Sequence, residues 1–459
     1  MRKEKLNNKP DIKGWKIGWA QLIALGFVTL ILVGTLLLCL PISSRTGKFT
    51  SPIDAAFTAV SASCVTGLIT LDTATHWNTF GQIVILVMIQ IGGIGFMTTA
   101  VLLSLIFKRS ITPRERMLVA MSYNLNSYES ISVLIKRVTI GTLCIEGIGA
   151  SILAIRFIPD FGLAEGVYKS IFHSVSAFCN AGFDIIGTEP NIPSISYYAT
   201  HPLVNLTLAF LIIFGGIGFL VWSDVINFAT KKRRLSVYSR FVIIVTLILL
   251  VSGTILTAIM EWNNPATIGG FSVPEKILAS FFQSVTWRTA GFATLENYAL
   301  NESTQYLGMV LMFIGGASGS TAGGVKVATF GIVMFAVWCV AIGRKKTVIF
   351  GRTVSDNSFV RATAVIVVQI IAAACGVILL NVFDSFAMKD ILYEVVSAVS
   401  TVGLTLGITS SLSAASKVVI MMLMYFGRVG ILTVTYAVLR SQSAKDGHIS
   451  YPDANMLIG

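Results

Sequence analysis

One short stretch recurs four times along the chain, and it constrains the fold more than any other feature. The copies read FTAVSASCVTGL (57–68), FHSVSAFCNAGF (172–183), FQSVTWRTAGF (282–292) and EVVSAVSTVGL (394–404). Each runs from an apolar, small-residue segment into a glycine; the four are Gly67, Gly182, Gly291 and Gly403. Successive glycines are 115, 109 and 112 residues apart, which indicates one structural unit used four times.

Four such units predict four glycine-centred loops around one axis. Backbone carbonyls from such a ring can replace the hydration shell of a cation. The alternative explanation is close packing of membrane helices, which favours small residues at their contacts. Packing accounts for scattered glycines but not for one glycine at a fixed place in each unit, so we favour the pore.

The composition is that of an integral membrane protein. Of the 459 residues, 54% are hydrophobic and only 12% are charged, and the mean hydropathy is +0.79. Membrane helices need apolar runs of about twenty residues, and the chain contains several. A net charge of +12 would suggest nucleic acid in a soluble protein. Here the basic residues flank apolar runs, so the positive-inside rule explains them and no nucleic-acid partner is expected.

The sequence offers no positive case for an enzyme. Its six cysteines form no CxxC pair, and its four histidines are scattered. The sequence contains no HExxH, GxSxG or Walker glycine loop. We therefore expect neither catalysis nor an organic cofactor in this chain.

Each unit reads as helix, short re-entrant pore helix, glycine loop, helix. The re-entrant part has roughly ten to fourteen apolar residues, too few to span a bilayer. Irregular backbone beyond it must be buried in protein or line a water-filled cavity. We therefore predict an all-α membrane fold with eight transmembrane helices around a pseudo-fourfold pore. Its expected parts are a tail at 1–16, pore repeats at 17–107, 117–229, 235–342 and 353–440, and a tail at 441–459.

Charge predicts the orientation. The first apolar run, about 17–40, is too long for a signal-peptide core and lacks a small-residue cleavage site, so we expect a retained helix. The basic segments 1–16, 108–116, 230–234 and 343–352 fall on one side of an eight-span topology. Acidic residues collect on the other side: Asp54, Asp72, Asp160, Glu165, Asp184, Glu189, Glu296, Glu302 and Asp384. We expect a multi-pass protein of the cell membrane with both termini cytoplasmic.

A second glycine series lies in the second helix of each unit. Its copies are IGGIGF (91–96), FGGIGF (214–219), IGGASGSTAGG (314–324) and FGRVGI (426–431). Glycine there allows close approach to the pore segment. Half of residues 315–324 are glycine, which should interrupt the helix inside the membrane. We predict a flexible gate loop below the glycine ring, formed by Gly315, Gly316, Ser318, Gly319, Ser320, Thr321, Gly323 and Gly324 with the neighbouring Lys326; the alternative is a kink.

The fourth copy of this series contains Arg428 near the middle of the last helix. A buried arginine at that depth should face a protein interior or an aqueous cavity. It is a fixed positive charge beside the cation path, one half of a salt bridge with Glu146 as the candidate partner, or both, because the two roles are compatible.

These motifs together resemble the Trk/Ktr/HKT superfamily of potassium-translocating proteins over nearly the whole length. The resemblance rests on the four pore-loop repeats, the glycine-rich interruption in the third unit and the arginine in the fourth. Eight spans without an additional leading pair, TWRTAGF (286–292) and the ending ISYPDANMLIG are most similar to the Ktr-type membrane subunit, KtrB or KtrD.

The resemblance implies a potassium-selective filter. The four repeat glycines would be its centre, and further carbonyls that bind K⁺ would come from Val65, Thr66, Asn180, Ala181, Thr289, Ala290, Thr401 and Val402. In the family, a serine at the first filter position accompanies sodium permeation, whereas this chain has glycine in all four. The same resemblance implies that 315–324 is the gate and Arg428 the pore arginine.

The resemblance also implies partners. Ktr membrane subunits form homodimers with one pore per protomer. They dock on a cytosolic octameric ring of nucleotide-binding RCK subunits, of the KtrA/KtrC type, which responds to ATP and ADP. This chain would then be a channel-like potassium uptake subunit, with sodium as a candidate activator. The alternative is a sodium- or proton-coupled potassium symporter, although transporters typically use inverted repeats and these four units are parallel.

Overall fold

The computed structural model describes residues 11–12, 15–16, 19–95, 131–187, 194–231, 234–344 and 346–430, and these are almost entirely helical. The expected basic segment 108–116, the tail 441–459 and parts of the apolar runs 80–107 and 418–439 lie outside the described residues. Of the tail 1–16, the structure describes two short paired strands, β1 (Asp11–Ile12) and β2 (Trp15–Lys16).

Three kinds of helix recur in each unit. The first helices are α1 (Trp19–Cys39), α6 (Ile131–Phe161), α10 (Val237–Glu261) and α14 (Asp356–Phe383). The pore helices are α2 (Pro52–Cys64), α7 (Leu163–Phe178), α11 (Val273–Thr286) and α15 (Met388–Ser400). The helices that follow the glycine loops are α3 (Thr79–Ile94), α8 (Pro202–Gly216), α12 (Glu302–Phe313) and α16 (Ala414–Tyr425). Short 3₁₀ turns η1 to η4 lie at Pro41–Ser43, Ile195–Tyr198, Asn297–Ala299 and Thr409–Ser411.

The first helices are the longest apolar elements of the described residues. Within the described residues, four helices are long and apolar enough to cross a bilayer, and they are α1, α6, α10 and α14. Large apolar side chains on these helices remain exposed, such as Leu36 on α1 and Ile259 on α10. Exposed apolar faces of this kind are stable in lipid. These faces fit the predicted all-helical membrane fold, whereas the count of eight spans stays a prediction.

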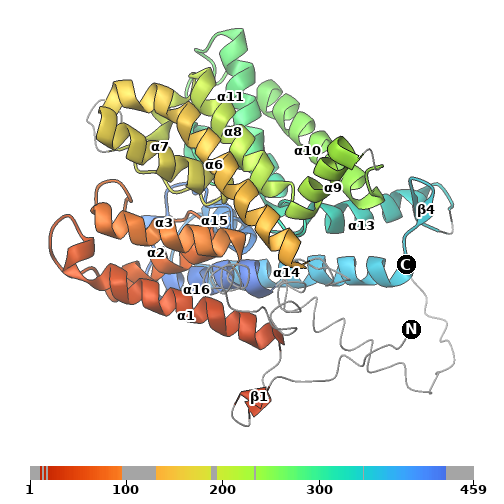
Figure 1. Cartoon of the computed structure of the whole chain (residues 1–459), viewed down its shortest axis with the longest axis horizontal. Helices are drawn as coiled ribbons and strands as arrows, with labels where there is room; N and C mark the ends of the chain where they lie inside the picture. The colour runs from red at the N-terminus through yellow and green to blue at the C-terminus, as the bar shows by residue number, and fades with distance from the viewer. Residues whose placement is uncertain are drawn as a thin grey trace.

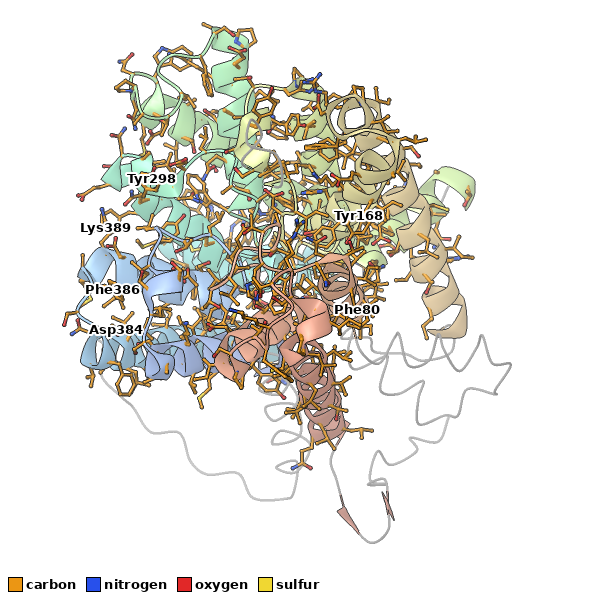
Figure 2. All side chains as sticks on the ribbon, turned by 90° about the vertical axis from the view of Figure 1, so that its left-hand side faces the viewer. Phe80, Tyr168, Tyr298, Asp384, Phe386 and Lys389 are labelled. Carbon is orange, nitrogen blue, oxygen red and sulfur yellow. The ribbon has the colours of Figure 1, made fainter. Side chains whose placement is uncertain are left out.

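The units are arranged in a ring. The helix after each glycine loop packs on the pore helix of the next unit: α3 on α7, α8 on α11, α12 on α15 and, closing the circle, α16 on α2. Figure 1 shows α1, α2, α3, α14 and α16 running side by side. In Figure 2, Phe80, Tyr168, Tyr298 and Phe386, one from each successive unit, lie at successive positions around the centre. This arrangement is the pseudo-fourfold one expected from the repeats.

The glycines of the second series do two things. A methyl group on Gly93 would lie 2.6 Å from the Cys179 sulfur, so the first glycines of the motif allow the close approach that we predicted. The last glycine ends the helix instead: Gly95 has φ +95° and Gly218 has φ +94°. The left-handed region is readily accessible to glycine and disfavoured for other residues.

The second full helix expected in the second unit, over its apolar run at about 203–228, is therefore two helices. The axis turns by 97° between α8 and α9 (Phe219–Lys231). The glycine-rich segment 315–324 of the third unit occupies this corner. Backbone N–H groups of Ala317 and Thr321 donate to the carbonyls of Gly216 and Gly215, and Phe219 donates to the carbonyl of Gly319 at 2.9 Å. These bonds satisfy the backbone groups that the broken helix would leave unpaired.

The third and fourth units are also interrupted after α12 and α16. Residues 314–326 form an irregular loop before α13 (Val327–Ala341), so the interruption expected at 315–324 is present. In the fourth unit the helix widens into a π-helical turn, Phe426–Gly430, which contains Arg428. Single π turns inside helices are common at functional sites.

The basic segment 343–352 contains a tight hairpin. Strands β3 (Val348–Ile349) and β4 (Arg352–Thr353) pair antiparallel. Phe350 and Gly351 between them have φ values of 47° and 76°, as a two-residue hairpin turn requires. The third and fourth units are thus joined by a short, exposed connection.

Candidate functional site

The same strained turn follows all four pore helices. Two residues before each repeat glycine, a non-glycine residue adopts the left-handed conformation: Val65 (φ 58°), Asn180 (φ 60°), Thr289 (φ 65°) and Thr401 (φ 51°). The glycines themselves have φ values of 94°, 68°, 79° and 94°. A non-glycine residue in this region costs on the order of 1–3 kcal/mol and persists only where its surroundings hold it. Such strain concentrates at functional sites.

The four glycines lie next to one another around a ring. A methyl group added to Gly182 would lie 2.7 Å from the Cα of Gly291. A methyl group on Gly67 would lie 3.3 Å from the Cα of Gly182, and a methyl group on Gly403 would lie 2.9 Å from the Cα of Gly67. Gly67 therefore has Gly182 and Gly403 as its two neighbours. The ring order is therefore the order of the units in the chain, and the second and fourth units lie opposite each other.

Backbone carbonyl oxygens lie between neighbouring loops of this ring. A methyl group on Gly67 would lie 2.5 Å from the oxygen of Ala181, and one on Gly291 would lie 2.5 Å from that of Val402. A methyl group on Gly182 would likewise lie 2.9 Å from the oxygen of Ala290, and a methyl group on Gly403 would contact the oxygen of Thr66. The structure thus brings together the oxygens of all four residues that precede the glycines.

The C-terminal ends of the pore helices hold these turns. The backbone N–H groups of Thr66, Ala181 and Val402 each donate to a carbonyl of the preceding helix at 2.8 Å. Ala290 makes the corresponding bond to Thr286 at 3.0 Å. Because the C-terminal end of a helix carries partial negative charge, four such ends near one ring favour a cation there.

Four pore-helix hydroxyls also hold the loops, and sequence reasoning assigned them no role. Ser61 and Ser397 accept from the glycine N–H groups of their units at 3.0 and 3.1 Å. Ser176 and Thr286 donate to the carbonyls of Phe183 and Phe292, directly after the glycine. The signal was present, because all four copies carry serine or threonine directly after a valine at this place.

The predicted gate residues form one loop that lies against the turns. The hydroxyl of Thr321 contacts the carbonyl of Phe178 and the side chain of Asn180, both at 3.1 Å. Gly323 is so close to the Thr401 side chain that no Cβ would fit between them. Thr321, Gly323 and Gly324 are buried, whereas Ser318, Gly319 and Ser320 are partly exposed.

Arg428 connects this loop to the first unit. Its guanidinium donates to the carbonyl of Thr321 on the loop and to the carbonyls of Gly92 and Gly93 at the end of α3. The carboxylate of Glu146, the alternative salt-bridge partner, accepts from Gln90 at 3.2 Å. The contacts of Arg428 therefore place its charge at the loop predicted to be the gate.

Two further cations contact the same loop. Lys326 folds back onto the carbonyl of Ala322 at 2.6 Å, so it caps the loop from its own end. Arg288, which the sequence analysis did not single out, donates to the carbonyl of Gly315 at 3.2 Å. The signal for Arg288 was its position: it lies three residues before Gly291, where the other copies have Cys64, Cys179 and Ser400.

Known proteins are similar to this chain over nearly its whole length. A family model described as cation transport protein, TrkH, matches residues 21–448. The potassium/sodium uptake protein NtpJ of Enterococcus hirae is 40% identical over 96% of this chain and 97% of its own length. The Ktr system potassium uptake protein B of Bacillus subtilis is 40% identical over 96% of both chains.

The fold has a counterpart among solved structures. The crystal structure of the potassium transporter TrkH from Vibrio parahaemolyticus matches with a TM-score of 0.72 at 17% identity, over 94% of this chain and 86% of that one. The resemblance inferred from the repeats is thereby confirmed, and the protein is a multi-pass membrane transporter rather than an enzyme. The chain belongs to the TrkH family of cation transport proteins.

Proposed function

We propose that this chain takes up potassium ions through a channel-like pore at the ring of Gly67, Gly182, Gly291 and Gly403. The observation that carries the proposal is the same strained turn in four units, with carbonyl oxygens between neighbouring loops. Dehydrated K⁺ is stabilised by such oxygens. The names of the relatives, which include potassium uptake protein, support the choice of ion.

The bound ion would be held by backbone oxygens of the turns. They would come from the glycines and from the two residues before each: Val65 and Thr66, Asn180 and Ala181, Thr289 and Ala290, Thr401 and Val402. Each unit supplies a single glycine rather than a TVGYG filter, so we expect fewer ordered sites and weaker selectivity than in potassium channels.

The loop 315–324 would be the gate of this pore. It lies against the turn residues Asn180 and Thr401, where it would obstruct an ion leaving the ring. Arg428 would hold it there through the carbonyl of Thr321. Glycine-rich backbone has few side chains to pack, so this loop gains little from any one conformation and can move.

We further propose that the chain works in a multi-component system at the cell membrane, with both termini cytoplasmic. Relatives named as proteins of a Ktr system support a separate regulatory partner. We expect a homodimer on a cytosolic RCK ring that binds ATP and ADP. Sodium remains a candidate activator, and the potassium/sodium uptake protein among the relatives supports its testing.

A coupled symporter is the second candidate, and one buried acid supports it. Glu146 on α6 is 5% exposed and bonded to Gln90, beside the Cys179 that precedes the second turn. Buried carboxylates in membrane helices commonly mark coupling sites. If flux requires a sodium or proton gradient and Glu146→Gln abolishes that requirement, the symporter replaces the channel.

Potassium uptake into proteoliposomes, with sodium as competitor, tests the filter. Gly67→Ser should weaken the discrimination between the two ions, because a side chain there meets the Ala181 carbonyl at positive φ. Gly47→Ser is the matched control: Gly47 also has positive φ (66°) but has open space around it. Unchanged selectivity in folded Gly67→Ser protein would remove this glycine from the filter.

A further inference from the structure

Every pore helix carries a buried polar side chain at one equivalent position. The residue at this position directly follows a buried aromatic residue. It lies three residues before the serine or threonine whose hydroxyl holds the loop, which is Ser61, Ser176, Thr286 or Ser397. The occupants of this position differ in chemistry, and each has an exposed fraction of 0%: Thr58, His173, Gln283 and Glu394. Polar groups buried this deeply are costly unless they are hydrogen-bonded, so their partners are informative.

In the second unit, the partner is an acid directly beyond the glycine. The Nε2 atom of His173 lies 2.9 Å from Oδ1 of Asp184, two residues after Gly182. Asp184 in turn accepts from the backbone N–H groups of Ile186 and Ile195, both at 2.7 Å. The pore helix is thereby connected to both ends of the segment that follows the glycine.

In the fourth unit, the acid is on the helix and the hydroxyls are on the loop. Glu394 accepts from the hydroxyl of Thr405 at 2.7 Å and from that of Thr409 at 2.6 Å. Thr405 stands two residues after Gly403, as Asp184 stands after Gly182. The same two positions are therefore bonded with the chemical roles exchanged.

The other two units are different. The side chain of Gln283 in the third unit donates at 3.0 Å to Asn297, which lies six residues after Gly291 rather than two. The hydroxyl of Thr58 in the first unit donates to the backbone carbonyl of Asp54 in its own helix at 3.0 Å. In the described part of the first unit, Thr58 makes no hydrogen bond to the segment after Gly67.

We infer that His173 and Glu394 are positioning residues for the filter, and that their contacts with Asp184 and Thr405 fix two opposite sides of the ring. The strained turns need surroundings that hold them. A bond from the middle of the pore helix to the residue two beyond the glycine fixes the exit of the turn, as the helix end fixes its entry. This inference rests on the proposed filter function.

The inference has a consequence for ion selection. The radius of a carbonyl ring and its freedom to relax determine which dehydrated ion it suits. The exits of the second and fourth loops are bonded to the middle of their pore helices, whereas in the described part of the first unit Thr58 makes no such bond, so the ring should resist widening along the diagonal from the second to the fourth loop more than along the other. Releasing a held loop should therefore admit sodium more readily without removing any carbonyl.

Thr405→Val tests this, because it removes one hydroxyl at the surface of the loop and keeps the side-chain shape. We expect the KM for potassium to rise at least about fivefold, the equivalent of the lost bond to Glu394, because the same hydroxyl also accepts from the N–H of Gly407 and from the hydroxyl of Thr409, both at 2.9 Å. Sodium should compete better, with the maximal rate retained. Thr405→Ser should restore both values because it returns the hydroxyl. Thr58→Val is the matched control and should leave the KM and the sodium competition unchanged.

A second variant, on the opposite side of the ring, keeps the test informative if Thr405→Val does not fold. Asp184→Asn keeps the shape and should produce the same shift in KM and in sodium competition. Thermal unfolding of the purified variants shows whether each is folded. If folded Thr405→Val and Asp184→Asn behave like Thr58→Val while Gly67→Ser alters selectivity, the positioning role is wrong and the filter stands. If Gly67→Ser also has no effect, the filter itself is wrong.

Discussion

Replacing Arg428 by alanine should raise potassium flux. The substitution removes charge-assisted hydrogen bonds to the carbonyls of Thr321, Gly92 and Gly93; the bond to Thr321 connects to the loop 315–324, and the bonds to Gly92 and Gly93 hold the arginine on α3. A hydrogen bond to a charged group is worth about 1.5–3 kcal/mol, so the ratio of held to released loop should fall about 10- to 150-fold. The loop keeps other bonds, such as Thr321 N–H to Gly215, so we expect the lower end of this range.

The assay is potassium flux into proteoliposomes at fixed membrane potential, normalised to folded protein. If the loop mostly blocks the pore in the parent chain, flux should rise about tenfold in Arg428→Ala, as the population shift predicts. The loss of a positive charge would also lower the electrostatic barrier for cations. Arg428→Lys separates the two effects, because lysine keeps the charge but cannot connect several carbonyls as guanidinium does.

The control is Arg156→Ala, which removes an equal charge that pairs with Asp160 on α6. Raised flux in both Arg428 variants supports the hydrogen-bonded clamp, and raised flux in Arg428→Ala alone supports the charge barrier. Parent-level flux in folded Arg428→Ala would refute both. Loss of folded protein in every Arg428 variant would indicate a structural role.

Three further predictions concern the loop, the partner and the turns. Deleting Ser318–Ser320 should raise flux and make it less dependent on the cytosolic ring and its nucleotide; a folded deletion with nucleotide-controlled flux at the parent level would leave only a kinked helix. Calorimetry should detect no binding of ATP or ADP to the purified chain, whereas it should detect binding to the chain with a candidate ring. Binding to the chain alone would contradict the proposal that a separate subunit binds the nucleotide. Ser61→Ala should lower the unfolding free energy by about 1 kcal/mol and weaken ion discrimination, because the N–H of Gly67 loses its acceptor; Ser151→Ala, which removes only a bond within exposed α6, should affect neither.

The repeat could be recognised from the sequence because each copy carries the same local requirement. A glycine with positive φ is needed at one place in every unit, so evolution leaves it at a regular period. The interruption at 315–324 was predictable for a related reason: half of these residues are glycine, far more than a helix tolerates. Its role as a gate stays a prediction.

What the sequence did not predict depends on contacts between units. At the 97° corner beside Gly218, the loop of the third unit bonds to the last turn of α8. The residues of the apolar run itself do not indicate that a loop from another unit will bind there. The contacts of Arg428 with carbonyls of the first unit, and that of Arg288 with Gly315, likewise join segments far apart in the chain. Pairing across such separations follows from tertiary packing, which local pattern does not report.

The closed circle of packing has a consequence for how the protein is made. The first pore helix, α2, packs on α16, and Asp54 on α2 pairs with Lys417 on α16 at 2.8 Å. At synthesis rates of about 5–20 residues per second, α2 waits roughly 20–70 seconds in the membrane before its neighbour has been translated. Cys64, fully buried at the end of α2, reports on this interval. In chains arrested on the ribosome, its thiol should react with a small maleimide before residues 414–425 have entered the membrane and become protected afterwards; equal protection in both would mean that another segment covers the first pore helix during biogenesis.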